Sequence, residues 1–391
     1  MTTESETKFS GRGSTSPSTL QPSRTFLDLI RLRRVEGDAA DVFRSVNRPE
    51  KMGNLGPIAY GGCVIALVIA SAYQTVKEEE GFKLYSFLGN FLGPTRTDRE
   101  VNLKVTRLRE TRTFQTRLVI ASQILEDGEE RKCFSATLDF MTTGPGRNGE
   151  VGGSIIHREG DPNPFRPYSV KPIYPRQHHS QLERATDLVS SKVESGQLSR
   201  SDHERYKEIF GLFNRHFDTK LVPGSIHADN IKGFIPGAEL SQVSGREGRK
   251  GLTERYTCDW FKVKEQEYPP SSSEVGILPT SRKALNASSL AFALDGALSF
   301  LPLTFSNLGL NQASACSSLE CSLRFHSPDF DSETNWAYRE QRTISGSDQR
   351  TFSESYLFDE NDNLIATMSQ ISVLRPLPDP ISDRSTGLSK L

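Results

Sequence analysis

One acidic residue stands alone in a strongly apolar part of the sequence. Across residues 290–303 the only charged side chain is Asp295, and its neighbours include Phe292 and Leu294. A carboxylate buried there loses its hydration, so it must either keep a proton or find hydrogen-bonding partners. Because a desolvated carboxylate of raised pKa is also a stronger base, Asp295 is a candidate general base. The alternative is a structural carboxylate that caps a neighbouring turn.

Two other groups of reactive residues have weaker patterns. Cys316 or Cys321 with His326 could supply a thiol nucleophile and its base, but small buried thiols on a strand are commoner, and nothing nearby predicts a lowered thiol pKa. The pair His178-His179 lacks the spaced cysteine or acidic partners that metal sites use. We therefore expect loop histidines there and propose no metal.

Length and composition exclude several classes of protein. The 391 residues are enough for two domains, and 48 basic against 49 acidic side chains give a net charge of −1. Such a chain has no field that would attract nucleic acid or an anionic membrane. The five cysteines show neither C-x-x-C pairs nor zinc-finger spacing, which predicts reduced thiols. The longest apolar runs, 64–72 and 290–303, are shorter than the roughly 20 residues that cross a bilayer, so we expect no membrane span.

The elements that must position Asp295 recur twice along the chain. In the first half an apolar helix follows Gly61-Gly62, and alternation of apolar and polar residues from Val101 onward predicts neighbouring antiparallel strands. The second half repeats this order, with a buried helix at about 286–300 and strands that end at Phe325 or cover 336–343, 351–358 and 364–374. A helix followed by a strand meander, twice, predicts a duplicated α+β unit.

Changes in composition suggest where these units begin and end. We expect a disordered segment at 1–24, one repeat at 25–145, a linker or insert at 146–250 with a helix near 202–217, a second repeat at 251–376, and a tail at 377–391. Thr25-x-x-Asp28 predicts a capping box at the start of the first repeat, and Ser201-x-x-Glu204 predicts a cap for the helix of the insert.

This order, with a Gly-Gly helix in the first copy and a lone helix aspartate in the second, resembles the acyl-CoA thioesterase II family. The resemblance runs from about Phe26 to Pro376. It includes YGGCVIA against the family's F-G-G-Q-V, and SFLGNFLGP against its S-F-H-S-Y-F-L-R-P. It implies a double hotdog of the α+β class, in which each repeat wraps an antiparallel sheet round a central helix.

The resemblance also implies where the catalytic residues lie. Asp295 in ALDGALSFLP matches the family's helix aspartate, Ser318 ahead of RFHSP matches its strand hydroxyl, and Gln370 in IATMSQISV matches the glutamine of its last strand. In thioester hydrolysis these groups would orient a water and accept its proton. The first copy has no acidic residue in helix 62–76 and has Leu84 where Ser318 is expected, so we expect it to be inactive.

The substrate-binding residues that we expect come from three positions. Gly61 and Gly62 would let a ligand or backbone approach a helix N-terminus closely, and His326 lies in the RFHSP motif. The chain departs from the family pattern at Cys63, which replaces a glutamine, and at Ser327, which replaces an arginine. These departures leave the acyl preference open.

We therefore expect an acyl-CoA thioesterase that converts a fatty or specialised acyl-CoA to the free acid and coenzyme A, with no cofactor beyond the coenzyme A of its substrate. One alternative is a hotdog enoyl-CoA hydratase, which needs an Asp/His pair, and no helix histidine lies within a turn or two of Asp295. Another is a non-catalytic acyl-CoA-binding protein of a biosynthetic pathway. Primary lipid metabolism and a secondary-metabolite pathway both fit.

The last three residues of the sequence form a targeting signal. Ser389-Lys390-Leu391 matches the address that the peroxisomal import receptor reads at a free C-terminus, and the preceding stretch is polar. We expect a peroxisomal protein with the import receptor as a partner. A homo-oligomer stays open.

Overall fold

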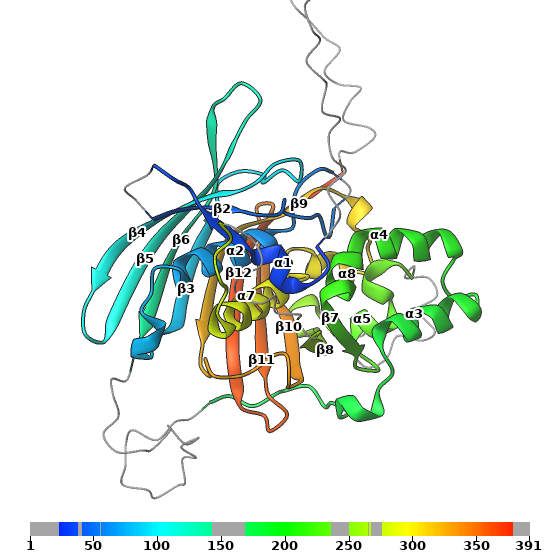
Figure 1. Cartoon of the computed structure of the whole chain (residues 1–391). Coiled ribbons are helices and arrows are strands. Elements are labelled where there is room, and N and C mark those ends of the chain that lie inside the picture. Colours follow the sequence, from blue (N-terminus) through cyan, green and yellow to red (C-terminus); the bar gives the residue numbers. More distant parts are fainter. Residues whose placement is uncertain are drawn as a thin grey trace, which may run out of the picture.

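The computed structural model describes residues 23–37, 41–54, 56–142, 169–235, 250–264, 266 and 276–377. Within them the chain forms a twelve-stranded antiparallel sheet around two central helices, a double hotdog of the α+β class (Figure 1). Nearly all of segment 1–24, and the whole of Ser389-Lys390-Leu391, lie outside the described residues, so the expectations for them stay predictions.

The first repeat begins with the predicted capping box. The side chain of Thr25 accepts a hydrogen bond from the backbone N–H of Asp28 at 3.1 Å, and the Asp28 carboxylate accepts one from the N–H of Thr25 at 3.1 Å, which confirms the prediction. The elements that follow are α1 (Phe26–Ile30), β1 (Leu32–Arg34), β2 (Asp41–Ser45), α2 (Gly61–Tyr73), η1 (Glu78–Glu80), β3 (Lys83–Phe91), β4 (Asn102–Glu110), β5 (Phe114–Ile124) and β6 (Glu130–Met141).

The insert and the second repeat contain the remaining elements. The insert holds η2 (His179–Gln181), α3 (Ala185–Glu194), α4 (Arg200–His216), β7 (Phe217–Leu221), α5 (Ile226–Asp229) and η3 (Ile231–Gly233). The second repeat holds η5 (Leu252–Glu254), β8 (Tyr256–Val263), α7 (Arg282–Asp295), η6 (Leu298–Phe300), α8 (Leu301–Phe305), η7 (Leu310–Gln312), β9 (Ala313–Phe325), β10 (Ala337–Ser347), β11 (Arg350–Phe358) and β12 (Leu364–Pro376).

The sheet joins the two repeats edge to edge. Its strand order is β1-β2-β4-β5-β6-β3-β9-β12-β11-β10-β8-β7. The strands of the two repeats therefore follow in the same order outward on either side of the β3–β9 junction. Across that junction the strands pair antiparallel from Ser86 opposite Arg324 to Asn90 opposite Glu320. The continuous sheet therefore fixes the position of one repeat relative to the other.

The two central helices lie side by side within the curve of the sheet (Figure 1). Every residue of α2 from Gly62 to Tyr73 is buried, because the helix is apolar on all sides. The Ser288 hydroxyl of α7 donates to the carbonyl of Ala66 at 3.0 Å and links the helices. By length and composition Arg282–Phe305 could cross a membrane, but 83% of its apolar window is buried inside the fold, as in the core helix of a globular domain.

The helix that carries the candidate base ends earlier than expected. We predicted it at about 286–300, whereas α7 ends at Asp295 itself. Gly296 is its C-cap, and Ala297 has a φ of 82°, which a right-handed helix cannot contain. Asp295 is therefore the last helical residue. In the first repeat the equivalent position, counted from the first residue of each helix, is occupied by Gln74, which comes directly after α2.

The insert packs against the second repeat through one face of α4. The buried face of α4 contains Tyr206, Ile209, Phe210 and Phe213, which recur at helical spacing. The predicted cap at Ser201 was wrong. Ser199 caps α4 instead, accepting from the N–H of Asp202 at 3.0 Å, because two overlapping Ser-x-x-acid motifs precede the helix and the chain uses the first. Strand β7 extends the sheet at β8.

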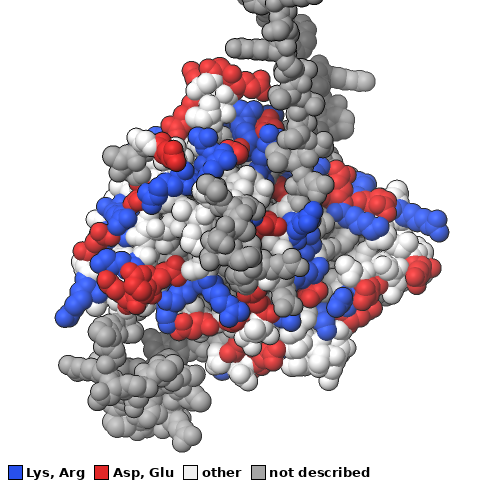
Figure 2. All heavy atoms as spheres, viewed as in Figure 1, with Lys and Arg blue, Asp and Glu red and all other residues white. Residues whose placement is uncertain are grey.

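Charged side chains of both signs are interspersed over the visible face of the molecule (Figure 2). This distribution agrees with the near-zero net charge of the chain.

Candidate active site

The carboxylate of Asp295 faces the N-terminus of the other central helix. Gly61 begins α2, and a Cβ atom built on it would lie 3.0 Å from Oδ2 of Asp295 and 2.9 Å from Cζ of Phe91. On Gly62 a Cβ would lie 2.3 Å from the Tyr60 ring. The two glycines therefore permit a close approach, as expected. The group that lies against Gly61 in the structure is the carboxylate of Asp295. Each repeat contributes one helix end to the same site.

Gln370 is hydrogen-bonded directly to Asp295. Its Nε2 donates to Oδ1 of Asp295 at 2.6 Å, and both residues are buried, with Gln370 at 1% exposure. The Ser372 hydroxyl donates to Oε1 of Gln370 at 3.3 Å, which orients the amide so that its nitrogen points at the carboxylate. The structure thus brings together two of the three residues that the resemblance implied.

Burial raises the pKa of Asp295 from 3.8 to about 6. Hydrogen bonds from Gln370, from Tyr60 and from the backbone N–H of Gly62 oppose this rise because they stabilise the charged form. The single proton of the Tyr60 hydroxyl is shared between Asp295 and the carbonyl of Phe292, which lies 2.7 Å from the hydroxyl oxygen, and burial holds the pKa of Tyr60 well above its usual range. The carboxyl group is therefore ionised at neutral pH but remains a stronger base than an exposed aspartate.

Ser318 lies on the wall of the same cavity, without a hydrogen bond to the other two residues. It stands opposite Ser372, where the register of β9 and β12 shifts between Ile371 and Ser372. Its side chain lines the cavity that contains Asp295. Within the described part of the chain, no hydrogen bond joins Ser318 to Asp295 or Gln370, so these three residues share a cavity rather than a closed network.

A buried ion pair that no pattern in the sequence indicated holds the end of α7. Arg339 on β10 binds Asp259 on β8 through two contacts, from Nε to Oδ1 at 2.9 Å and from Nη2 to Oδ2 at 2.6 Å. Nη1 of Arg339 also donates to the carbonyl of Ala293, and Gln341 Nε2 donates to the carbonyl of Gly296 at 2.7 Å. These donors satisfy the final carbonyls of α7, so they fix the helix end that carries Asp295.

The cavity that contains Asp295 has a volume of about 420 Å³ and lies between the two repeats. It is bounded by the first repeat at Tyr60, Gly61, Val64 and Phe91, by the insert at Phe210, Phe213 and Lys232, and by the second repeat at Asp295, Ser318 and Arg339. A second cavity of about 680 Å³ adjoins it and shares Gly53, Asn54, Lys232 and Cys316 with it. Side chains such as Ile58 and Leu92 line the first cavity and are half exposed, so it opens to solvent.

His326 is the expected site residue that the structure does not bring to the cavity. Its side chain is exposed at the end of β9, where Nε2 lies 3.2 Å from the Thr367 hydroxyl. It is absent from the described lining of both cavities. Because an extended strand rises about 3.3 Å per residue, the motif at the end of β9 lies far along the strand from Ser318 and its cavity.

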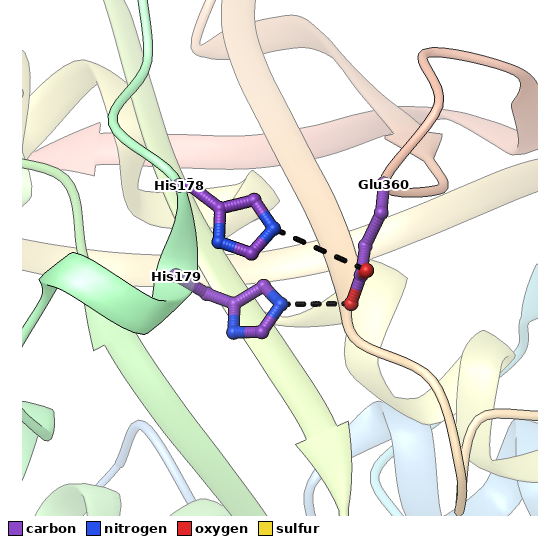
Figure 3. Close-up of side chains that lie close together, drawn as sticks. All are labelled: His178, His179 and Glu360. Atoms are coloured by element: carbon purple, nitrogen blue, oxygen red, sulfur yellow. Dashed lines mark hydrogen bonds and ion pairs between the residues drawn. The ribbon is translucent and has the colours of Figure 1, made fainter.

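His178 and His179 have an acidic partner that the sequence did not reveal. Nε2 of His179 lies 2.7 Å from Oε1 of Glu360, and Nε2 of His178 lies 4.0 Å from Oε2 of the same carboxylate (Figure 3). Glu360 belongs to the turn between β11 and β12, so the contact ties the insert to the second repeat. The Lys220 ammonium donates to the His179 carbonyl at 2.8 Å and would repel a bound cation. We interpret this cluster as a polar link.

Comparisons with known proteins cover both repeats of the chain. Residues 48–141 match the family model of the acyl-CoA thioesterase N-terminal domain, and residues 210–374 match that of the acyl-CoA thioesterase C-terminal domain. No curated protein matches the sequence significantly.

Several solved structures share the fold. The tesB protein of Mycobacterium avium subsp. paratuberculosis aligns with a TM-score of 0.55 and 15% identity, over 90% of this chain and 98% of that one. An acyl-CoA thioesterase II of Mycobacterium marinum aligns with a TM-score of 0.53 and 17% identity, over 91% of this chain and 98% of that one. A hot dog protein of Alicyclobacillus acidocaldarius gives 0.53 and 15%, over 90% and 98% of the two chains. At such identities the likeness shows the fold.

Proposed function

Because the chain belongs to the acyl-CoA thioesterase family, we propose that it hydrolyses the thioester of an acyl-CoA by general-base catalysis, with Asp295 as the base. The observation that carries this proposal is the contact between the Asp295 carboxylate and the Gln370 amide, buried at a cavity wall beside the N-terminus of α2. A buried carboxylate held in this way, next to a helix N-terminus, is suited to activate water against a carbonyl group.

The proposed reaction moves one proton through Asp295. The carboxylate takes a proton from a water molecule while the water oxygen bonds to the thioester carbon. The oxyanion that forms is stabilised by the positive end of the α2 dipole, where the N–H of Gly62 already binds Asp295 and that of Cys63 binds the Tyr60 carbonyl at 3.0 Å. The C–S bond then breaks, and the proton held by Asp295 passes to the departing sulfur. The products are the free acid and coenzyme A as a thiol.

Gln370 and Ser318 would hold the attacking water. The Gln370 amide already donates to the carboxylate, and Ser318 offers a hydroxyl on the same cavity wall. A water between them has the two or more polar partners that an ordered water needs. In this scheme the first repeat supplies a helix end and an apolar wall, while the acid–base chemistry stays in the second repeat.

Release of free thiol from acyl-CoA tests the proposal. The wild-type chain should release coenzyme A, and Asp295→Asn should lower the rate at least about a hundredfold, because it removes the base but keeps the shape. Asp139→Asn is the matched control: Asp139 is a partly exposed carboxylate of β6 that binds Arg109 at 3.1 Å, and its loss should change the rate little. Turnover that survives in Asp295→Asn would refute the assignment of the base.

A second pair of variants addresses the hydroxyl. Ser318→Ala should slow thiol release about tenfold or more if the hydroxyl orients the water, while Ser322→Ala, on the same strand but outside the described cavity lining, should not. Equal rates in the two variants would remove Ser318 from the mechanism.

The same assay separates the alternatives. A hydratase would consume an enoyl-CoA without releasing thiol, and it needs a histidine near the base, whereas the described lining of the cavity contains none. A non-catalytic binding protein would bind acyl-CoA and do neither. We propose thioester cleavage because the carboxylate and its amide partner are both present and in contact.

A further inference from the structure

A lysine with no role in the proposed chemistry lines the cavity. Lys232 belongs to η3, is only 9% exposed, and lines both the cavity that contains Asp295 and the adjoining one. Its Nζ lies 4.8 Å from the centre of the Phe210 ring and 5.8 Å from that of Phe213. Over the described residues, the structure gives this ammonium neither a hydrogen-bond acceptor nor an ion-pair partner. The side chain is mostly buried, and its ammonium borders the open space of the two cavities.

The backbone holds Lys232 in a strained conformation. Ile231, Lys232 and Gly233 have φ values of 45°, 55° and 90°, and the left-handed region is unfavourable for residues other than glycine. The segment cannot relax easily. A Cβ on Gly233 would lie 2.7 Å from the carbonyl oxygen of Leu308, and Asn230 Nδ2 donates to the carbonyl of Thr304 at 2.9 Å. The backbone that carries the lysine is therefore held in place by its surroundings.

The electrostatic surroundings leave the charge of Lys232 uncompensated. Burial lowers its pKa to about 8, so the ammonium is charged at neutral pH. Asp259 opposes this shift and Arg339 adds to it, but Asp259 already binds Arg339 through two contacts. Lys232 also lines the adjoining cavity, whose described lining does not include Asp295, so the ammonium lies toward the end of the space that is farther from the reacting carboxylate. Such a group can recognise a part of the substrate that is distant from the thioester.

Resting on the proposed thioesterase activity, we propose that Lys232 is a specificity-determining residue that binds a carboxylate on the acyl chain, so that the substrates are acyl-CoAs with an acidic acyl group. A buried cation on an apolar wall attracts an anion strongly because the pair is shielded from water. A coenzyme A phosphate is a poor candidate for this place. It is multiply charged and strongly hydrated, whereas Lys232 is enclosed by phenylalanine rings.

Matched pairs of acyl-CoAs test this proposal on the full chain. Succinyl-, glutaryl-, adipoyl- and suberoyl-CoA would each be compared with the neutral straight-chain acyl-CoA of the same carbon number. For each pair the readout is the ratio of kcat/KM for the acidic substrate to that for the neutral one. The wild-type protein should favour the acidic substrate in at least one pair. Lys232→Met should lower that ratio ten- to a hundredfold, the range of one charge-assisted hydrogen bond.

Two further variants keep the result interpretable. Lys232→Arg keeps the charge and should keep a preference for the acidic substrate, which shows that the site still folds. Lys207→Met removes an exposed lysine of α4 that pairs with Glu204 at 2.9 Å, and it should leave the ratio unchanged. A ratio that is the same in the wild type and Lys232→Met at every chain length would overturn the proposal. An equal loss on both members of a pair would also do so, because it would indicate a contact with coenzyme A.

Failure of the proposed function would be seen separately. If the wild-type protein released no thiol from any substrate, the thioesterase proposal would fail. The same pairs would then be titrated calorimetrically against the wild type and Lys232→Met. Tighter binding of the acidic member, lost in Lys232→Met, would still support the lysine site, and equal binding of the two members by the wild type would refute it.

Discussion

Replacement of Asp295 by asparagine should make the folded protein more stable at neutral pH while it abolishes turnover. The side chain is 5% exposed, and its environment disfavours the negative charge that the proposed reaction needs. Asparagine has nearly the same shape and can still accept the hydrogen bond from Gln370, but it carries no charge. The variant should therefore gain stability and lose activity, which is the trade-off expected where an active site lowers the stability of the fold.

The raised pKa gives the size of the effect. In the unfolded chain the carboxyl group loses its proton near pH 3.8, whereas in the folded protein it keeps the proton up to about pH 6. Between these values the folded state binds more protons than the unfolded state, so the free energy of unfolding of the wild type falls as the pH rises. The difference between 3.8 and about 6 corresponds to about 3 kcal/mol, all of which is lost above pH 6.

Urea unfolding of the wild type and Asp295→Asn, measured from about pH 4 to about pH 8, tests this sign and size. The advantage of the variant should grow by up to about 3 kcal/mol across the lower half of that range and stay constant above it. Asp139→Asn serves as the control and should show no such gain. A difference between wild type and Asp295→Asn that does not change with pH would refute the reasoning, because the carboxyl group would then titrate alike in both states.

Thiol release by the wild type should rise with a slope of about one up to about pH 6 and then level off, because only ionised Asp295 accepts a proton. Gln370→Leu removes a hydrogen bond to that ion, so the rise should move to higher pH, and an unmoved rise would contradict the role of the amide. Gly61→Ala should lower kcat/KM roughly ten- to a hundredfold, because the added methyl group displaces the Asp295 carboxylate. Gly211→Ala is the control, since a Cβ built there has no atom within 4 Å, and similar kinetics in the two variants would count against the close approach. Arg339→Met leaves a buried carboxylate unpaired and should lower the free energy of unfolding by about 3–5 kcal/mol, with part restored by adding Asp259→Asn; a loss below about 1 kcal/mol would show that the pair does not hold the helix end.

Local patterns in the sequence account for part of the fold. Strand β5 (Phe114–Ile124) alternates apolar and polar residues, so its period was visible. Strand β8 (Tyr256–Val263) was not predicted, because five successive residues are buried there, including Asp259, and the alternation is lost. The end of α7 was missed for a related reason. The sequence stays apolar beyond Asp295, and only Gly296 marks the break.

The candidate site could be predicted only where a motif carried it. Asp295 was visible as a lone charge in an apolar stretch, and the resemblance supplied Gln370, 75 residues away. Arg339 and Lys232 were missed, because their importance comes from strands and turns that meet only in the folded chain. His326 shows the converse, since its motif was recognised but its side chain is exposed and lies outside the described lining of the cavity.

The antiparallel arrangement of the two central helices leaves each chain with one complete candidate reaction centre. Gly61 at the start of α2 faces Asp295 at the end of α7, but at the corresponding place Arg282 begins α7 and Gln74 follows α2. An ancestor with two identical halves would have had two equivalent reaction centres, whereas this polypeptide keeps the parts for one. A covalent active-site label should therefore titrate to a single equivalent per chain, and neither half expressed alone should accept it.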